Sequence, residues 1–251
     1  MMNKLINIIV LTLSLFLFSS CGSENEEREV STGKLIVGTS ADNPPYEFIK
    51  DGEVVGFDID LIAEIAKELN RKLIVKNLDF PGLLPSVLSR NVDMVIAALS
   101  ITPERLHNVD FSIPYSSSEM AVLFLKDMHY RPENFAAHVI GVQFGTTWEE
   151  YVKKRLEGSE VGREKSLANN LALVQELINK NVDLVVMEKL QVMKFAAKYS
   201  ELNYQALEDT KTEFAIALPK GSEFTSQVNE VIKKLEANGF IEKLKEKWLS
   251  E

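Results

Sequence analysis

The chain lacks the residue types that several common kinds of site require. It has a single cysteine, which excludes an intramolecular disulfide and any site built from several thiolates. Its three histidines are scattered outside any HExxH motif, and GxGxxG, GxxxxGK[ST] and GxSxG are all absent. With 28 basic and 37 acidic residues, the formal net charge is −9, which argues against a nucleic-acid-binding surface. We therefore expect no metal, no cofactor and no nucleic acid as partner.

The first 20 residues have the pattern of an export signal. One charge, Lys4, precedes an apolar run from Leu5 to Phe18, which is shorter than the roughly 20 apolar residues of a membrane span. The run ends in Ser19-Ser20-Cys21, and FSSC resembles a bacterial lipobox. We expect a signal peptide over residues 1–20 and a lipid on Cys21, so that the chain is exported and anchored at the cell envelope. An unlipidated secreted protein and an uncleaved anchor are the alternatives.

The rest of the chain alternates between strand and helix patterns. Residues 21–32 are polar and lack Leu, Ile and aromatic residues, which predicts a flexible tether. From Gly33 onward, the alternation predicts an α/β fold, with Asp58 as the cap of the first helix. The predicted strands are Lys34–Thr39, Leu73–Leu78, Met94–Ala98, Val139–Val142 and Asp183–Met187. The predicted helices are Phe57–Leu69, Gly82–Ser89, one from Pro103, Thr147–Leu156, Ser166–Asn179, Lys189–Tyr199, and two after Ser222 that are separated by Asn238-Gly239.

Two extended apolar segments have the length needed to pass between two lobes. They are Met120–Leu125 and Glu213–Leu218. We therefore predict one lobe interrupted by another: residues 33–117 and 218–251 form lobe 1, and residues 118–217 form lobe 2 and include the hinge strands. A hinge follows from this topology.

Arg105 is the most informative candidate for a binding residue. Pro103 follows Thr102 at the first helical position, so Arg105 lies in the first turn of a helix directly after an apolar strand. Open α/β sheets bind ligands at this edge, and a guanidinium there can hold a carboxylate through two parallel N–H bonds. Ser100 and Thr102 add hydroxyl groups in the same turn. A surface arginine paired with a neighbouring glutamate is the alternative.

The second half of the chain offers a similar set. In Gly145-Thr146-Thr147, a glycine after a strand is followed by hydroxyl residues that open a helix, which is typical either of an anion site or of a plain helix cap. Glu188 ends an apolar strand, where it can accept an ammonium group or be an ordinary strand-end charge. Phe80 and Trp148 are candidate flat walls of a pocket, although packing roles also fit them.

Several stretches together resemble a family: the bacterial solute-binding proteins of polar amino-acid ABC transporters, of the glutamine, arginine and lysine–arginine–ornithine type. They follow the family's order over nearly the whole chain after the leader. The stretches are GTSADNPPYEF (38–48), GFDIDLIAEIAKEL (56–69), FPGLLPSVLSRNVDMVIAALSITPERLHNVDFSIPY (80–115), IGVQFGTTWEEY (140–151), VDLVVME (182–188), FAIALPKGS (214–222) and FIEKLKEKW (240–248). The pair of SITPER and an upstream GFDIDL is the most specific part.

This resemblance implies a two-lobed periplasmic-binding-protein (Venus flytrap) fold with a two-strand hinge. Such a protein closes on one free L-amino acid and delivers it to an ABC transporter permease. The resemblance implies that Arg105 binds the α-carboxylate, helped by Ser100, Thr102 and backbone N–H groups near Thr146 and Thr147. The α-ammonium would go to Glu188, which stands where the family usually has Asp, and to a carbonyl near Ala98.

Other positions bear on the ligand's side chain. By the same resemblance, Phe80 matches an aromatic residue that stacks on it, and Ser40 matches a position that is often Asp. Asn43 stands where many relatives have Tyr or Phe, so an aromatic sandwich is in doubt. Trp148 replaces a frequent Gln, and we expect it to fill or reshape the pocket.

Composition leaves the identity of the ligand open. Asp42 and the overall negative charge favour arginine or lysine, whereas Phe144, Met187 and Trp148 suit an apolar pocket. The same fold also serves as a cyclohexadienyl dehydratase-like enzyme and as a ligand-sensing module of receptors. Because the chain carries no recognisable catalytic motif, we expect a binding protein and no enzyme. We also expect a monomer.

Overall fold

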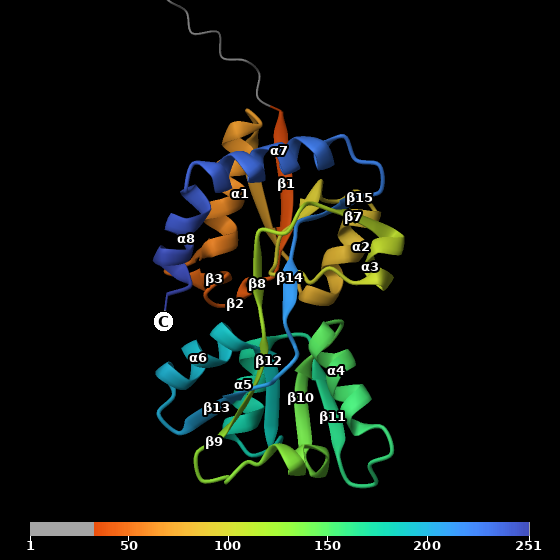
Figure 1. Ribbon diagram of the computed structural model, residues 1–251, viewed down its shortest axis with the longest axis vertical. Coiled ribbons are helices and arrows are strands. Elements are labelled where there is room, and N and C mark those ends of the chain that lie inside the picture. The colour runs from red at the N-terminus through yellow and green to blue at the C-terminus, as the bar shows by residue number, and fades with distance from the viewer. Residues whose placement is uncertain (1–32, 251) are drawn as a thin grey trace, which may run out of the picture. The chain divides into compact units, whose positions relative to one another are not determined.

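The computed structural model describes residues 33–250 (Figure 1). The predicted signal peptide, Cys21 and the predicted tether lie outside the described residues. The described chain forms two lobes, each built around a five-stranded sheet, as expected for the predicted α/β class (Figure 1). Within residues 33–250, no helix is long and apolar enough to cross a membrane.

The sheet of the first lobe has the strand order β5-β1-β6-β15-β7. Its strands are β1 (Lys34–Thr39), β5 (Lys72–Asn77), β6 (Met94–Val95), β7 (Val109–Phe111) and β15 (Ala217–Pro219). A small sheet beside it contains β2 (Asp42–Asn43), β3 (Glu47–Lys50) and β4 (Glu53–Val55). Strand β1 runs parallel to β5 and β6, whereas β15 runs antiparallel to β6 and β7. The chain therefore leaves the first lobe and returns late to complete its sheet.

Helices cover both faces of this first sheet. They are α1 (Phe57–Glu68), η1 (Phe80–Gly82), α2 (Leu83–Leu88), α3 (Pro103–Asn108), α7 (Phe224–Ala237) and α8 (Phe240–Trp248). On one face, Leu61 of α1 and Ile232 of α7 belong to one buried cluster. On the other face, Val87 of α2 packs in a cluster with Val95 and Ala217. Apolar side chains at helical spacing thus fix both layers on the sheet.

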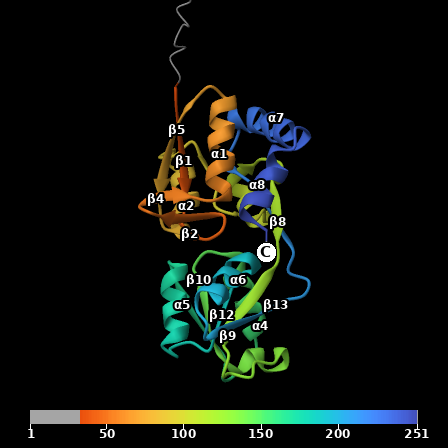
Figure 2. The same ribbon diagram turned by 90° about the vertical axis from the view of Figure 1, so that its left-hand side faces the viewer.

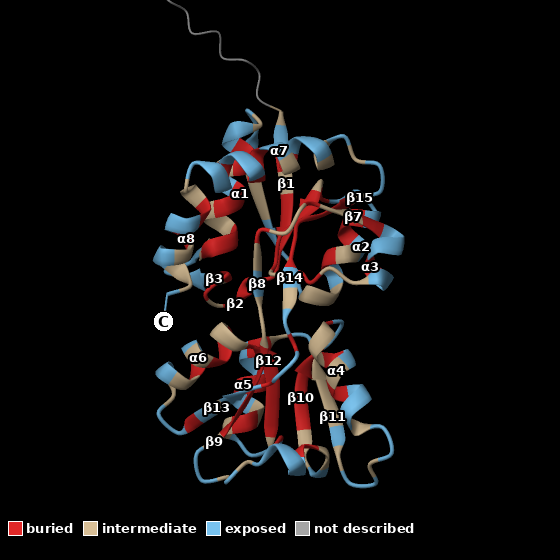
Figure 3. Ribbon diagram, viewed as in Figure 1, coloured by how far each residue is buried: buried red, intermediate tan, exposed pale blue. Residues whose placement is uncertain are grey.

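The second lobe repeats this plan. Its sheet has the order β11-β10-β12-β9-β13. The elements are β9 (Met120–Leu125), η2 (Pro132–Ala137), β10 (Val139–Gln143), α4 (Thr147–Leu156), β11 (Arg163–Leu167), α5 (Asn170–Ile178), β12 (Leu184–Glu188), α6 (Lys189–Lys198) and β13 (Leu202–Ala206). Leu173 of α5 and Phe195 of α6 pack on one face, and Val152 of α4 packs on the other. Buried residues accordingly concentrate along the strands (Figure 3).

The connection between the lobes differs from the prediction. Strands β8 (Ser116–Ser118) and β14 (Thr212–Phe214) pair antiparallel and run side by side between the lobes (Figures 1 and 2). The prediction that Met120–Leu125 crosses is wrong, because β9 pairs with β12 and β13 inside the second sheet. The chain also re-enters the first lobe before residue 218, since Ala215 N donates to the carbonyl of Leu99 at 3.1 Å. A wholly apolar run indicates a strand buried on both faces, which is the position of β9.

Two predicted elements have different limits in the structure. The strand predicted over Met94–Ala98 ends at Val95, and Ala98 has a left-handed φ of 42° that no regular strand accommodates. The helix predicted from Ser166 begins at Asn170, because Ser166 belongs to β11 and the side chain of Asn169 accepts the N–H of Ala172 at 3.1 Å as the helix cap.

Gly56 joins β4 to α1 in a conformation that glycine adopts most readily, with φ at 135°. A Cβ atom there would lie 2.1 Å from the carbonyl oxygen of Tyr46. We expect Gly56→Ala to lower the free energy of unfolding by about 1–3 kcal/mol through backbone strain, and further through this clash. Urea denaturation measures the loss. Gly52→Ala is the control, because Gly52 also has a positive φ but nothing within 4 Å of its Cβ position. Equal losses in the two variants would contradict the role assigned to the clash.

Candidate ligand-binding site

A small cavity lies between the two lobes and is lined by both. The lining residues are Asp42, Asn43, Glu47, Phe80, Ala97, Ala98, Ser100 and Arg105 from the first lobe, and Gln143, Thr146, Thr147 and Trp148 from the second. Most of the predicted site residues are therefore brought together. The cavity volume is about 10 Å³, which is room for about one water molecule. The lobes are closed against each other, so an amino acid can enter only if they separate.

Arg105 is buried at the centre of this contact between the lobes. Its Nη1 donates to the carbonyl of Ser100 at 2.8 Å, and its Nη2 donates across the cleft to the carbonyl of Gly145 at 3.0 Å. The guanidinium carbon also lies 5.9 Å from the ring centroid of Phe80. Burial lowers the pKa of Arg105 to about 10, so the group is still protonated at neutral pH. The guanidinium therefore faces the cavity and is not a surface charge paired with a glutamate.

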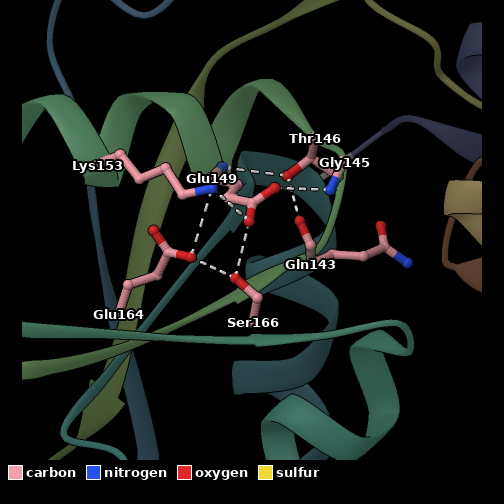
Figure 4. A network of polar contacts seen from close by, with 7 residues as sticks. All are labelled: Gln143, Gly145, Thr146, Glu149, Lys153, Glu164 and Ser166. Carbon is pink, nitrogen blue, oxygen red and sulfur yellow. Dashed lines mark hydrogen bonds and ion pairs between the residues drawn. The ribbon is translucent and has the colours of Figure 1, made fainter.

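The N-terminus of α4 forms a polar network on the other side of the cavity (Figure 4). Thr146 is the helix cap: its Oγ1 accepts the N–H of Glu149 at 3.2 Å. The carboxylate of Glu149 in turn accepts the N–H of Gly145 at 2.8 Å and the ammonium of Lys153 at 2.8 Å. Although burial alone would raise it, these hydrogen bonds lower the pKa of Glu149. Thr146 thus acts as a helix cap, and the N–H of Gly145 is hydrogen-bonded to the carboxylate of Glu149.

Glu188 does not line the cavity. Its Oε2 accepts the N–H of Gln191 at 2.8 Å, which caps α6, and its Oε1 accepts the hydroxyl of Ser118 on the hinge strand β8. The side chain is 1% exposed, and burial raises its pKa. In this closed structure Glu188 and Arg105 therefore do not face one cavity, and the contact of Glu188 with the ligand's α-ammonium stays a prediction. A glutamate at the end of β12 is long enough to reach the hinge, and both of its oxygens are occupied there.

Three other predicted residues lie beside the cavity but outside its lining. Ser40 is buried, and its hydroxyl lies 3.4 Å from Oδ1 of Asp42. Thr102 caps α3 by accepting the N–H of Arg105 at 3.2 Å. Gly145 contributes its carbonyl to Arg105. These residues position the lining residues Asp42 and Arg105.

Only some of the predicted aromatic and apolar residues line the cavity. Phe80 and Trp148 line the cavity, whereas Phe144 is 52% exposed and Met187 is fully buried in the core of the second lobe. Of the three residues predicted to favour an apolar pocket, only Trp148 is in place. Asn43 lines the cavity with an amide where an aromatic ring would complete a sandwich.

Glu47 is a cavity residue that sequence reasoning missed. It is fully buried; its Oε1 accepts Nδ2 of Asn43 at 3.1 Å, and its carboxyl group also interacts with that of Asp58. Burial, and then the nearby charge of Asp58, raise the pKa of Glu47 well above its ordinary value. Glu47 follows Tyr46 at the start of the short strand β3. Because polar and apolar residues alternate in most strands, a glutamate at this position does not indicate a cavity residue.

Asp58 lies behind Glu47 and is not the predicted helix cap. Helix α1 begins after Gly56, and its first turn has no side-chain cap. The carboxylate of Asp58 is instead fully buried, where it accepts the N–H of Ala98 at 2.7 Å and the hydroxyl of Tyr115 at 2.9 Å. Burial raises the pKa of Asp58 to about 6. Asp58 therefore holds the segment after β6 on which the cavity residue Ala98 lies.

Asp42 joins the two lobes directly. Its carboxylate accepts the N–H of Asn170 at 2.7 Å, at the N-terminus of α5, and Nε2 of Gln143 at 3.3 Å. Its backbone carbonyl accepts Nε2 of Gln191 at 3.0 Å. Burial raises the pKa of Asp42 to about 6, although these hydrogen bonds act in the other direction. Asp42 thus links the first lobe to the second through both its carboxylate and its backbone carbonyl.

The sequence and the structure both match known proteins. Residues 35–251 match the model of the bacterial extracellular solute-binding proteins, family 3. The chain belongs to this family. It is 33% identical to the arginine-binding extracellular protein ArtP of Bacillus subtilis over 254 residues, covering 99% of each chain.

Solved structures of the same kind superpose well. The crystal structure of the substrate-binding protein of an amino acid ABC transporter matches with a TM-score of 0.81 and 35% identity, covering 87% of this chain and 100% of that one. An ancestral arginine-binding protein bound to arginine matches with a TM-score of 0.83 and 33% identity, covering 87% and 99%. The two-lobed fold of family-3 solute-binding proteins is therefore shown for this chain.

The buried acids of this family-3 protein predict an unusual dependence of stability on pH. Asp42 and Asp58 each have a pKa raised from 3.8 to about 6, so between these pH values the folded state binds more protons than the unfolded chain. The free energy of unfolding should therefore fall as pH rises from about 4 to about 6, by roughly 2–3 kcal/mol for each carboxyl. Carboxyls with a lowered pKa, such as Asp110 and Glu176, are partly exposed and act in the opposite direction at lower pH.

Urea denaturation of the unliganded protein at pH 5 and pH 7 measures this effect. We expect greater stability at pH 5, and a smaller difference between the two pH values in Asp58→Asn, whose amide oxygen can still accept from Ala98 and Tyr115. Equal or greater stability of the wild-type protein at pH 7 would contradict the burial of these acids as protonated groups.

Proposed function

We propose that this chain is the substrate-binding component of an amino-acid ABC importer and that its ligand is a cationic amino acid, with arginine preferred. The charge of the cavity lining supports this proposal most strongly: the lining contains one guanidinium, that of Arg105, and two carboxyl groups, those of Asp42 and Glu47. Free arginine carries one carboxylate and two positive groups. The ligand therefore supplies the opposite charge to each ionisable group of the lining. The arginine-binding relatives agree with this assignment.

Each group of the ligand has a proposed partner. The guanidinium of Arg105 binds the α-carboxylate in place of the Gly145 carbonyl, together with the hydroxyl of Thr147 on the opposite lobe. The α-ammonium lies near the carbonyl of Ala98 and the hydroxyl of Ser100. These assignments use bidentate and charge-assisted hydrogen bonds, which are the strongest available in such a site.

The side chain of the ligand extends toward the acidic part of the lining. The carboxyl group of Glu47 accepts from the ligand's guanidinium, and Asp42 adds a second negative charge. A cation beside Glu47 offsets the burial that raises the pKa of this carboxyl, so arginine binding should ionise it. Phe80 and Trp148 provide faces on which the guanidinium and its methylene stem pack.

Closure of the lobes is the proposed working motion. In the closed structure Arg105 bonds Gly145, and Asp42 bonds Asn170, so the lobes hold each other directly. Opening breaks these contacts, and a ligand that touches both lobes replaces them. Because such a ligand has higher affinity for the closed form than for the open form, it shifts the equilibrium toward closure. The closed protein then delivers the amino acid to the permease.

A thermal-shift screen of the purified protein against the twenty amino acids, ornithine and citrulline tests this function. A ligand at 100 times its dissociation constant stabilises the protein by about 2.7 kcal/mol, which gives a clear shift of the melting temperature. We expect the largest shift with arginine and smaller shifts with lysine and ornithine. Stabilisation by neutral or acidic amino acids alone would overturn the cationic assignment, and no shift with any of them would overturn the binding function.

We infer that the site binds its ligand without changing it. The relatives reported above are binding proteins of transport systems. The expected result is full recovery of arginine after prolonged incubation with the protein, and no aromatic product from prephenate or arogenate. Formation of either product would support the enzyme alternative.

We also propose that the chain is exported, carries a lipid on Cys21 and acts as a monomer at the cell envelope. Metabolic labelling with a radioactive fatty acid tests the lipid. We expect label in the wild-type protein and none in Cys21→Ala, which should be released from the membrane fraction. Labelling that survives the substitution would place the lipid elsewhere.

A further inference from the structure

A second concave surface lies between the lobes, outside the ligand cavity. We call it the interlobe groove. It has a volume of about 360 Å³ and is lined by Ala41, Asp42, Pro44, Phe48, Ile49 and Lys50 from the first lobe and by Leu171, Lys194, Phe195 and Lys198 from the second. The proposed function uses only Asp42 of these residues.

The floor of the interlobe groove is apolar and partly open to solvent. Ile49 is 57% exposed and Leu171 is 46% exposed, although both are large apolar side chains on a charged protein. The two residues come from different lobes and line one groove. An exposed apolar surface rimmed by polar residues is typical of a protein interaction site.

The rim of the groove is basic. Lys50, Lys194 and Lys198 are exposed, and within residues 33–250 none of them forms a salt bridge with an Asp or Glu side chain. The closest polar contact of Lys194 is the carbonyl of Ser250 at 3.3 Å. On a chain with a net charge of −9, three lysines without a salt-bridge partner in the described part of the chain form a local positive region. Its charge complements an acidic partner.

The groove depends on the closed conformation. Residues of both lobes line it, so separation of the lobes divides its floor. Asp42 lines both the ligand cavity and the groove, and its carboxylate holds the second lobe through Asn170. The complete groove is therefore present only when the lobes are closed.

We propose that the interlobe groove is a docking surface for an acidic segment of the importer's membrane subunit, which inserts an apolar side chain between Ile49 and Leu171. This proposal rests on the proposed transport function. A protein segment fits better than a lipid surface, because the apolar floor is concave and a flat bilayer cannot reach it. Docking in the groove lets the transporter distinguish the closed from the open protein.

Charge reversal on the rim tests the proposal in cells. Lys50→Glu combined with Lys198→Glu changes one lysine on each lobe; Lys243→Glu combined with Lys154→Glu is the matched control away from the groove. We expect the rim variant to lower the initial rate of radiolabelled arginine uptake by about tenfold or more, because like charges then face each other. The control should keep the wild-type rate. Equal rates in the two variants would overturn the proposal.

The apolar floor has its own matched pair of variants. Ile49→Ser with Leu171→Ser removes the two exposed apolar groups of the groove, and Leu106→Ser with Val161→Ser removes groups of 41% and 66% exposure elsewhere on the two lobes. Uptake should fall in the first variant only. The arginine affinity of every purified variant, measured by calorimetry, separates the docking proposal from the proposed transport function. Lost uptake with unchanged affinity supports docking. Absence of arginine binding by the wild-type protein would overturn the transport function itself.

Photocrosslinking identifies the occupant of the groove. The photoreactive amino acid p-benzoylphenylalanine is placed at Leu171 of the full chain in cells that carry an epitope-tagged permease subunit. We expect an adduct with that subunit, more of it in the presence of arginine, and none from the same group placed at Val161. An adduct with lipid, or with a second copy of this chain, in place of the permease would overturn the assignment.

Discussion

Replacing Arg105 with alanine is expected to weaken arginine binding by about 2–5 kcal/mol, which is roughly a 30-fold to several-thousand-fold increase in the dissociation constant. The physical reason is that the ligand's carboxylate would be buried without its charged partner. Arg105 is 8% exposed, and no other lysine or arginine lines the cavity formed by the described residues. Isothermal titration calorimetry of the purified variant measures the change.

A ligand without a carboxylate isolates the proposed contact between Arg105 and the α-carboxylate. Agmatine is arginine without its carboxylate, so the loss of affinity caused by Arg105→Ala should be large for arginine and small for agmatine. Arg131→Ala, which removes an exposed arginine, is the control for net charge. A similar loss for both ligands would show that Arg105 acts through the structure of the cleft, through its bonds to Ser100 and Gly145, and not through the carboxylate.

Replacing Glu47 with glutamine should reduce arginine affinity about 10- to 150-fold. This corresponds to the 1.5–3 kcal/mol of a hydrogen bond to a charged group. The substitution keeps the shape of the side chain and an oxygen that can accept Nδ2 of Asn43, while it removes the group that ionises beside the bound cation. The folded protein should lose no stability, because the unliganded glutamate is buried and burial raises its pKa.

Calorimetric titration with arginine and lysine measures this effect, and both cations should bind the variant more weakly. Glu53→Gln removes an exposed carboxylate from the neighbouring strand β4 and is the matched control. If Glu53→Gln weakens binding as much as Glu47→Gln does, the general negative charge of the protein and not the cavity carboxyl selects the ligand.

The sequence predicted the fold well because periodicity and helix-start signals are local. Thr102 and Pro103 placed the start of α3, and the side chain of Thr102 does cap that helix. The crossing strands were harder: Met120–Leu125 is apolar along its whole length, which indicates burial on both faces but cannot tell a central strand from a hinge. The true hinge strand β8 is three serines, and such a short polar segment carries no strand signal.

Part of the candidate site was predictable because helix-start signals are local. Arg105 and Thr147 lie at helix starts that follow strands, and the structure brings both to the cavity between the lobes. Glu188 also follows a strand, yet its carboxylate turns to Ser118 and Gln191, because a side chain's choice among nearby donors depends on tertiary contacts. Glu47 and Asp58 are buried by elements that are distant in the chain, so no local pattern marks them.

The most direct test compares arginine with citrulline, its uncharged analogue of nearly the same shape, by calorimetric titration of the wild-type protein. If Arg105 holds the carboxylate while Glu47 and Asp42 select a positive side chain, arginine should bind at least about tenfold more tightly than citrulline at neutral pH. Arginine should also bind more weakly at pH 5, where Asp42 is protonated. Equal affinities for the two ligands at neutral pH would contradict recognition of charge by this cleft.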